Sequence, residues 1–206
     1  MVLFSLIKTD ALPLPAIQHN NLLYHMQTVL ILLAITVAAT ATLFSLSPNY
    51  TISYSTSHSE LAHAHYSQNL NTHGMNYLQI YTNPLVSTLE QHHAAGFLEG
   101  YTTYLEIQSA YLNYQNFRLK TQSLSPKLQT FINSQFEFID TMAARFPRDL
   151  YWQTAYNYLE QCRYIYRGFL TRLHTENRLD LTLPFSNFYY LTNAGDLREL
   201  IPALNS

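Results

Sequence analysis

The residue whose type most directly suggests chemistry is Cys162, the only cysteine among 206 residues. A thiol attacks as the thiolate, and burial in apolar surroundings raises its pKa and makes that form scarce. Cys162 falls within a run of apolar residues at helical spacing, so we interpret it as a core cysteine. A reactive thiol, or pairing with a cysteine outside this chain, is the alternative.

Two histidines near the middle of the chain are candidate metal ligands. His63 and His65 alternate on a predicted strand and therefore share one face. His58 and His73 are the nearest third ligands, but both fall in predicted turns. A surface pair, or a pair satisfied by hydrogen bonds, is the favoured interpretation. We therefore predict no metal site and no cofactor.

The remaining candidates lie on one predicted helix. His92 and His93 are adjacent there and point about 100° apart, which is poor geometry for joint ligation. Glu99 lies between Gly96 and Gly100, where a carboxylate could act as a general base or orient another group. An ordinary structural acid is the simpler interpretation. Nucleophile elbow, P-loop and dinucleotide motifs do not occur, so we predict no catalytic residue in this chain.

Composition excludes several classes of protein. The chain is 48% hydrophobic and 12% charged, which argues against disorder. Its 11 basic and 13 acidic residues leave no basic patch of the size that nucleic acid requires, so we expect no nucleic-acid partner. A single cysteine excludes an internal disulfide framework. The length suits one domain with a hydrophobic core.

Strands at the front and helices behind them must position these residues. Short uncharged segments and one alternating segment predict strands at 52–54, 61–66, 75–81 and 179–183. Apolar residues at helical spacing predict long helices at 85–114, from Ser125 to before Pro147, and from Asp149 through Leu173, with a short helix at 196–204. This order of elements predicts an α+β fold.

Two details of the helices carry structural information. Gly96 and Gly100 share one helix face, and each costs about 1 kcal/mol relative to Ala, so we expect them to admit another backbone. Ser125 with Pro126 in the first turn, and Asp149 before the next helix, are predicted caps.

Residues 26–46 form an uncharged and mainly apolar run. Its most apolar part, 29–37, is followed by Ala39-Thr40-Ala41, a cleavage pattern that would leave a mature chain starting at Thr42. An uncleaved anchor and a buried core helix are the alternatives, because about 20 residues can span a bilayer. We expect residues 1–41 to be an extension with a signal peptide or anchor, Met26 being a second candidate start, and residues 42–206 to form the domain.

This front end predicts a location and a modification. A signal of this kind predicts a secreted or lysosomal protein, or one anchored in a membrane through residues 26–46. Asn49-Tyr50-Thr51 is a complete N-glycosylation sequon just past the run, so Asn49 is the predicted glycosylation site.

Several segments resemble the phospholipase B-like proteins. Residues 71–84 read NTHGMNYLQIYTNP and residues 94–103 read AAGFLEGYTT, similar to the family's "N-T-x-G-W-x-x-L-x-I" strand and "A-A-G-x-x-E-G-x-x-T" helix start. Tyr151-Trp152 with the helix through Gly168, and the Gly195-Asp196-Leu197 segment, extend the resemblance in colinear order over about residues 50–205. Met75 departs from the pattern, since the family usually has Trp there.

The resemblance implies a secreted or lysosomal N-terminal-nucleophile hydrolase with a four-layer αββα core. In that family, cleavage of the precursor frees a Cys whose thiol attacks an ester or amide carbonyl, with its own α-amino group as base. That Cys follows the segment resembling Gly195-Asp196-Leu197, so Cys162 does not take its role.

We therefore expect this chain to be an N-terminal fragment, inactive by itself, of a hydrolase of lipid acyl esters or related amides. Its expected partners are the remaining C-terminal chain of the precursor and a lipid substrate. We also expect exposed apolar patches, because the helices and strands would pack on that missing part. The alternative is a non-catalytic secreted or membrane-anchored binding protein derived from the same fold.

Overall fold

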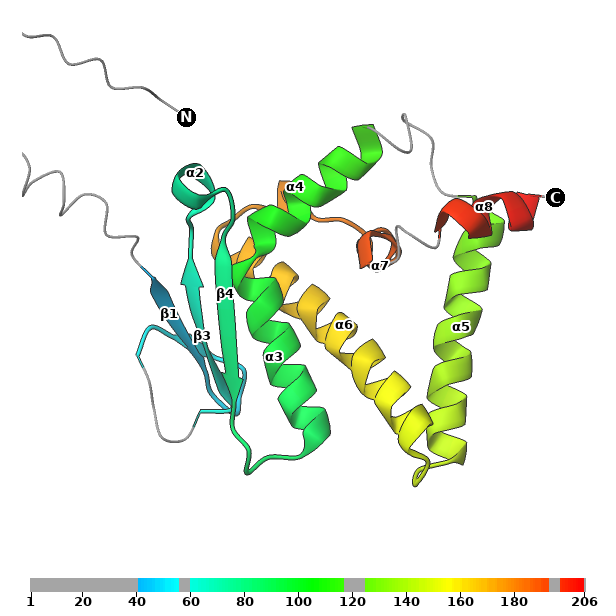
Figure 1. The fold of residues 1–206 in the computed structure, drawn as a ribbon, viewed down its shortest axis with the longest axis horizontal. Helices are drawn as coiled ribbons and strands as arrows, with labels where there is room; N and C mark the ends of the chain where they lie inside the picture. The colour runs from blue at the N-terminus through cyan, green and yellow to red at the C-terminus, as the bar shows by residue number, and fades with distance from the viewer. Residues whose placement is uncertain (1–40, 56–59, 117–124, 193–196, 206) are drawn as a thin grey trace, which may run out of the picture. The chain divides into compact units, whose positions relative to one another are not determined.

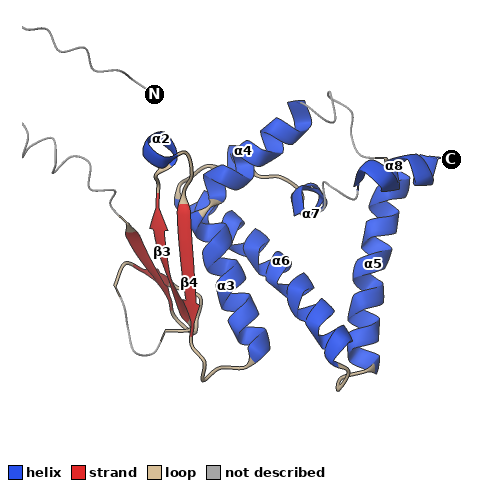
Figure 2. Ribbon diagram, in the orientation of Figure 1, coloured by secondary structure: helices blue, strands red, loops and turns tan. Residues whose placement is uncertain are grey.

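An antiparallel sheet forms the first part of the chain that the computed structural model describes (Figure 1). The described residues are 41–55, 60–116, 125–192 and 197–205. The strands are β1 (Thr42–Leu46), β2 (Ile52–Ser53), β3 (Ala62–Ser67) and β4 (Tyr77–Thr82), in the order β2-β1-β3-β4. All neighbouring strands are antiparallel, and helices follow the sheet along the chain (Figure 2). The predicted α+β class is confirmed.

Strand β1 was not predicted, because its apolar residues read as the end of the run at 26–46. Thr42–Leu46 instead pairs along its whole length with β3, with Phe44 opposite Ala64. Residues 1–40, which hold the rest of that run and all of the proposed signal except Ala41, lie outside the described residues. Within the described ranges, none of the helices is both long and apolar enough to cross a membrane. The strands predicted at 52–54, 61–66 and 75–81 appear as β2, β3 and β4 with slightly shifted bounds.

The helices are α2 (Leu70–His73), α3 (Thr88–Thr102), α4 (Tyr104–Tyr114), α5 (Pro126–Arg145), α6 (Leu150–Thr175), α7 (Phe185–Thr192) and α8 (Leu197–Asn205). Both predicted caps are confirmed. The Ser125 hydroxyl accepts a hydrogen bond from the Leu128 amide at 3.3 Å, and the Asp149 carboxylate accepts one from the Tyr151 amide at 2.9 Å. These contacts satisfy amides that a helix start leaves without intrahelical partners.

The single helix predicted at 85–114 is wrong, because the chain bends at Thr103 and forms α3 and α4. The Thr102 hydroxyl donates to the Leu98 carbonyl at 2.8 Å, and the Thr103 hydroxyl donates to the Glu99 carbonyl at 2.7 Å. Threonine hydroxyls that bond back to the preceding turn compete with the backbone ladder and bend helices. The helix also starts later than predicted, at a capping box formed by Ser87 and Glu90.

The strand predicted at 179–183 is also wrong. Leu179–Leu181 is a short 3₁₀ helix, η2, and the chain then leads into α7, which was not predicted. The alternation of leucines reflects a turn that buries Leu183 while leaving Leu179 exposed. The Tyr166 hydroxyl of α6 holds this turn by donating to the Leu183 carbonyl at 2.8 Å.

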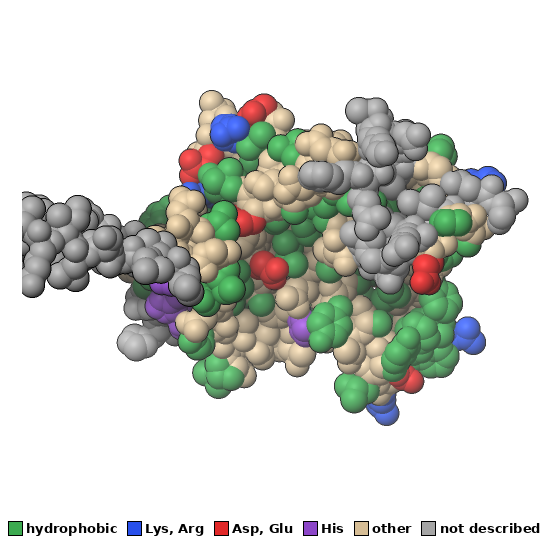
Figure 3. Space-filling model, turned by 45° about the horizontal axis from the view of Figure 1, so that its top comes forward, with side chains coloured by type: hydrophobic (Ala, Val, Ile, Leu, Met, Phe, Trp, Pro, Cys, Tyr) green, Lys and Arg blue, Asp and Glu red, His purple; other side chains and the backbone are tan. Residues whose placement is uncertain are grey.

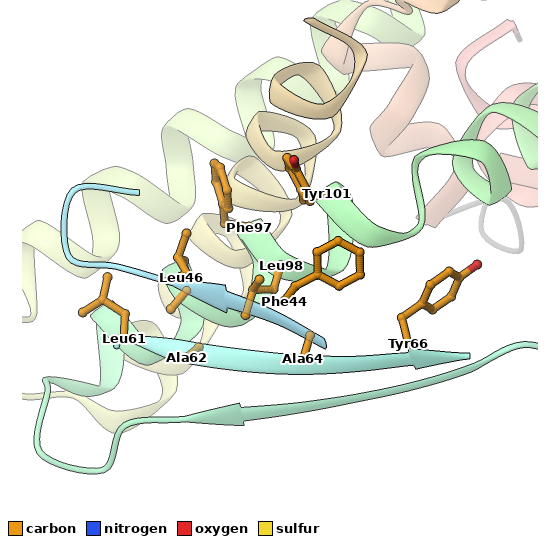
Figure 4. Close-up of a cluster of buried hydrophobic side chains, with 10 residues drawn as sticks. Phe44, Leu46, Leu61, Ala62, Ala64, Tyr66, Phe97, Leu98 and Tyr101 are labelled. Carbon is orange, nitrogen blue, oxygen red and sulfur yellow. The ribbon is translucent and has the colours of Figure 1, made fainter. Parts of the chain in front are cut away.

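Helix α3 packs on one face of the sheet, and α6 lies on the side of α3 away from the sheet (Figure 1). Figure 4 shows Phe44 and Leu46 of β1 lying between the sheet and α3, close to Leu98. Further buried residues of this core are Leu61, Ala62, Ala64, Tyr66, Ala94, Phe97 and Tyr101. The sheet and α3 are therefore one hydrophobic unit.

The second face of the sheet carries a different set of side chains. Because side chains alternate along a strand, those opposite the α3 contacts point away from that helix. This set, called the open face below, consists of Leu43, Ser45, Ser53, His63, His65, Ser67, Tyr77, Gln79 and Tyr81, of which Ser45 is buried. Tyr77 and Tyr81 are 52% and 51% exposed. The open face therefore contains no Asp, Glu, Lys or Arg.

Candidate functional site

Two of the segments that resemble the phospholipase B-like proteins, residues 94–103 and the helix through Gly168, meet where α3 crosses α6. A Cβ atom at Gly100 would overlap the backbone carbonyl of Ile165, and one at Gly168 would overlap that of Phe97. A Cβ atom at Gly96 would stand 2.5 Å from the carbonyl oxygen of Gln161. The expectation that Gly96 and Gly100 admit another backbone is confirmed. Gly168 of α6 likewise allows a close approach of the α3 backbone.

Glu99 lies between these glycines and faces a pocket of about 280 Å³. The pocket is lined mainly by apolar side chains of α4, α6 and α7, including Ile107, Ile165 and Phe188. Burial raises the pKa of the Glu99 carboxyl, because an apolar environment disfavours the charged form. Among the described residues nothing hydrogen-bonds to its side chain. Within the described ranges, Glu99 therefore has no hydrogen-bonded group that it could orient or activate.

Cys162 lies on α6, close enough to Glu99 of α3 for the two groups to interact electrostatically. Burial raises the pKa of its thiol, and the negative charge of Glu99 raises it further. Cys162 is half-buried and forms no disulfide. Both effects disfavour the thiolate, and the rise in the pKa of Cys162 agrees with the prediction made from its place in an apolar run.

A polar network that sequence reasoning missed ties α4 to the sheet. Asn76 donates to the Glu106 carboxylate at 2.6 Å and to the Tyr66 hydroxyl at 3.2 Å, and the Tyr66 hydroxyl donates to Glu106. Burial, followed by the hydrogen bond to Glu106, raises the pKa of Tyr66 to about 12. The Asn76 side-chain oxygen Oδ1 also accepts hydrogen bonds from the backbone amides of Asn69 and Leu70. The network members are too far apart in sequence for any local motif to reveal them.

His63 and His65 share the open face as predicted, with ring centroids 5.7 Å apart. His63 Nδ1 lies 2.6 Å from a carboxylate oxygen of Glu60, and its ring stacks on Tyr81 at 5.0 Å. Across the described ranges, the structure brings together no three His, Cys, Asp or Glu side chains that could hold a metal. His58 lies outside those ranges. The arrangement agrees with a pair satisfied by its neighbours.

His92 and His93 contact different residues of α6. His92 Nδ1 lies 2.7 Å from the Gln161 amide oxygen, and His93 Nε2 lies 2.9 Å from a Glu160 carboxylate oxygen. The two rings therefore point to different partners, Gln161 and Glu160. Their contacts bind α3 to α6 beside the glycines.

Asn49, the predicted glycosylation site, is exposed in the tight turn between β1 and β2. The next residue, Tyr50, has a φ of 61° and packs its ring against Phe97 at 5.3 Å. The turn is thus anchored in the core by Tyr50 while Asn49 stays accessible. Modification of Asn49 remains a prediction.

Together these features define an α+β scaffold: a sheet covered on one face by helices that pack through glycines, with half-buried groups that resist ionisation. The Phospholipase B family model matches residues 62–206. The chain belongs to the phospholipase B family, and the resemblance stated from its motifs is confirmed.

Individual relatives agree with this assignment. The chain is 27% identical over 145 residues to "Phospholipase B-like protein D" of Dictyostelium discoideum, covering 70% of this chain and 25% of the relative. It is 29% identical over 148 residues to "Phospholipase B" of Crotalus adamanteus and 28% identical over 147 residues to "Phospholipase B-like 1" of Bos taurus. These matches cover 70% of this chain and 26% and 27% of the relatives. The chain thus spans about a quarter of the length of these relatives.

Proposed function

We propose that this chain supplies the N-terminal scaffold of a phospholipase B-like hydrolase that acts on lipid acyl esters or related amides. The observation that carries the proposal is the family match over residues 62–206, which corresponds to about a quarter of each relative. The hydrolase is of the N-terminal-nucleophile type, and its nucleophilic Cys is contributed by the C-terminal chain of the same precursor.

The chemistry of the described residues supports a scaffold role. Burial raises the pKa of the Cys162 thiol and disfavours the thiolate that a nucleophile requires, and among the described residues no hydrogen bond orients the Glu99 carboxyl as a base. The tight crossing of α3 and α6 serves to fix the sheet, rather than to present a reactive group. Catalysis then requires groups from elsewhere in the precursor.

The open face of the sheet is where we propose that the rest of the enzyme packs. In an αββα arrangement, each sheet is covered by helices on one face and by the other sheet on its second face. The open face has half-exposed tyrosines, Tyr77 and Tyr81, and its titratable groups besides them are His63 and His65, with the Glu60 carboxylate 2.6 Å from His63. A second layer would bury these rings, and the contact between His63 and Glu60 already gives that carboxylate a partner.

The front of the chain supports a route out of the cytosol. We propose that residues 1–41 are a signal peptide or anchor, and that the protein is secreted or lysosomal. The uncharged run from Met26 and the exposed sequon at Asn49 support this proposal.

The test compares the 206-residue chain with the product of the gene read past Ser206, on vesicles of phosphatidylcholine. We expect fatty acid release only from the longer product. Cleavage of that product should expose a new N-terminal Cys beyond the Gly195-Asp196-Leu197 segment, and replacing this Cys by Ala should abolish the release. Hydrolysis by the 206-residue chain that is abolished by Cys162→Ala would contradict the proposal. A reading frame that stops after Ser206 would favour the non-catalytic binding protein.

A further inference from the structure

The end of the hairpin formed by α5 and α6 carries an unusual concentration of exposed apolar side chains. Leu150 is 80% exposed and Tyr151 71%, while Phe138 and Phe146 are 50% and 40% exposed. With Trp152, these residues are called the hairpin tip below. In Figure 3, hydrophobic side chains gather at the end of the molecule where α5 and α6 meet, with Lys or Arg side chains beside them. Exposed patches of this kind mark interaction sites.

The aromatic rings of the hairpin tip hold one another in place. Trp152 lies edge-on to Phe138, with ring centroids 5.5 Å apart, and edge-on to Tyr151, with centroids 4.9 Å apart. The Arg145 guanidinium lies 5.3 Å from the centroid of the Phe146 ring. Because these rings already contact one another, binding would order few additional side-chain torsions.

The charges around the hairpin tip are mixed and mostly satisfied. Arg145 and Arg148 are exposed beside it. The Asp149 carboxylate accepts hydrogen bonds from the Tyr151 and Trp152 amides at the start of α6, where the helix dipole offsets its charge. Glu137 is exposed nearby, and Asp140 pairs with Arg163 at 2.8 Å. The arginines are therefore the cations available to an external anion.

Several backbone groups at the turn of the hairpin tip have partners within the chain. The Phe146 amide donates to the Met142 carbonyl at 2.9 Å, and the Asp149 amide donates to the Phe146 carbonyl at 3.1 Å. The Gln153 side chain donates to the Ala143 carbonyl at 2.9 Å. Each backbone group that already has a partner within the chain lowers the cost of bringing this turn to a lipid surface.

We propose that the hairpin tip docks on a phospholipid bilayer surface. Tryptophan and tyrosine favour the boundary between water and acyl chains, and Leu150 would reach into the apolar side of it. Arg145 and Arg148 are placed to meet lipid phosphates, which guanidinium groups bind through paired hydrogen bonds. This docking is a property of the hairpin tip and does not depend on whether the protein hydrolyses lipid.

The chain contains a single tryptophan, so its fluorescence reports directly on the hairpin tip. The full chain is mixed with vesicles of ether-linked phosphatidylcholine that carry a brominated lipid, with and without phosphatidylserine. We expect a blue shift of Trp152 emission and quenching by bromine. Ether-linked lipids resist acyl hydrolysis, so the result is independent of the proposed enzymatic function.

Matched variants separate the hairpin tip from other apolar segments. The double variant Leu150→Ser with Tyr151→Ser should reduce partitioning by at least about tenfold, since two apolar side chains lose their burial. Leu85→Ser is the control, because Leu85 is 92% exposed in the loop before α3 and should leave partitioning unchanged. Arg145→Gln with Arg148→Gln should weaken binding most on phosphatidylserine vesicles.

Three results would overturn the proposal. The first is vesicle binding without any change in Trp152 fluorescence, which would place the contact elsewhere, for example in the apolar run near the N-terminus. The second is a double variant that binds as well as the unmodified chain. The third is an equal loss of binding in Leu85→Ser.

Discussion

The backbone of α3 at Gly100 touches the backbone of α6 at Ile165, at a distance that leaves no room for a Cβ atom. The two helices run in the same direction here, since Gly96 meets Gln161 and Gly100 meets Ile165. This contact joins the helix that covers the sheet to the longest helix of the described chain. The stability of the whole scaffold therefore depends on positions that carry no side chain.

Replacing Gly100 by Ala should destabilise the protein. Helix propensity alone would favour Ala by about 1 kcal/mol, but the added methyl group overlaps the Ile165 carbonyl. Overpacking of this kind costs about 1–3 kcal/mol, and more where backbone must move. Urea denaturation followed by circular dichroism measures the free energy of unfolding.

The matched control for this prediction is Asn133→Ala, at an exposed position of α5, which should be neutral or slightly stabilising. If Gly100→Ala proved as stable as the unmodified chain, the close crossing of α3 and α6 would be refuted.

Replacing Glu99 by Gln should stabilise the protein increasingly as pH rises. Burial raises the pKa of this carboxyl above its usual value of 4.5. Its contribution to stability is present below pH 4.5 and is lost as pH rises through the raised pKa, because ionisation is disfavoured in the folded state. The difference between variant and unmodified chain, measured by urea denaturation, should grow as pH rises above 4.5.

Glu90→Gln should show the opposite trend. Hydrogen bonds from the Ser87 hydroxyl and amide lower the pKa of Glu90, so its stabilising contribution is present above 4.5 and fades as pH falls. If the two variants followed parallel pH profiles, burial would not be the cause at Glu99.

Replacing Tyr66 by Phe should weaken the link between α4 and the sheet. The variant loses a hydrogen bond to the Glu106 carboxylate, and bonds to charged groups contribute about 1.5–3 kcal/mol. The pKa of Tyr66 is raised to about 12 from 10.0, so its extra stability is complete below pH 10 and is lost as pH rises toward 12. Stability curves should therefore converge over that interval, and a constant gap would count against the network.

Replacing Asn49 by Gln should remove a glycan. When the domain is directed into the secretory pathway by a heterologous signal, we expect a mass shift on treatment with an N-glycosidase. The shift should disappear in both Asn49→Gln and Thr51→Ala, because the sequon needs both residues. Asn71→Gln, outside any sequon, should leave it intact. A domain that is secreted without a glycosidase-sensitive mass would show that Asn49 is not used.

Local signals predicted the elements whose boundaries depend on caps and on periodicity. Ser125 and Asp149 start their helices where expected, since capping involves residues a few positions apart. The bend at Thr103 was missed because it arises from hydroxyl contacts within an otherwise regular apolar pattern. Strand β1 was missed because a buried strand and an apolar targeting segment have the same composition over a few residues.

Only those features of the candidate site that depend on residues of a single helix could be predicted from the sequence. The two glycines flanking Glu99 indicated a close backbone contact, although they did not identify α6 as the partner. The Tyr66–Asn76–Glu106 network joins three distant segments, and only the pairing of the strands brings them together. Tertiary contacts of this kind leave no spacing pattern in a single sequence.

The same-direction crossing of α3 and α6 also sets an order of events during synthesis. A ribosome completes β1 to β4 and α3 long before it reaches Ile165, because α4 and α5 are translated in between. Until α6 has been synthesised, the face of α3 that carries Gly96 and Gly100 is exposed and can contact chaperones or other nascent chains. Such non-local pairing slows folding. The early half of this protein is therefore expected to need protection until its late-arriving helix closes over it.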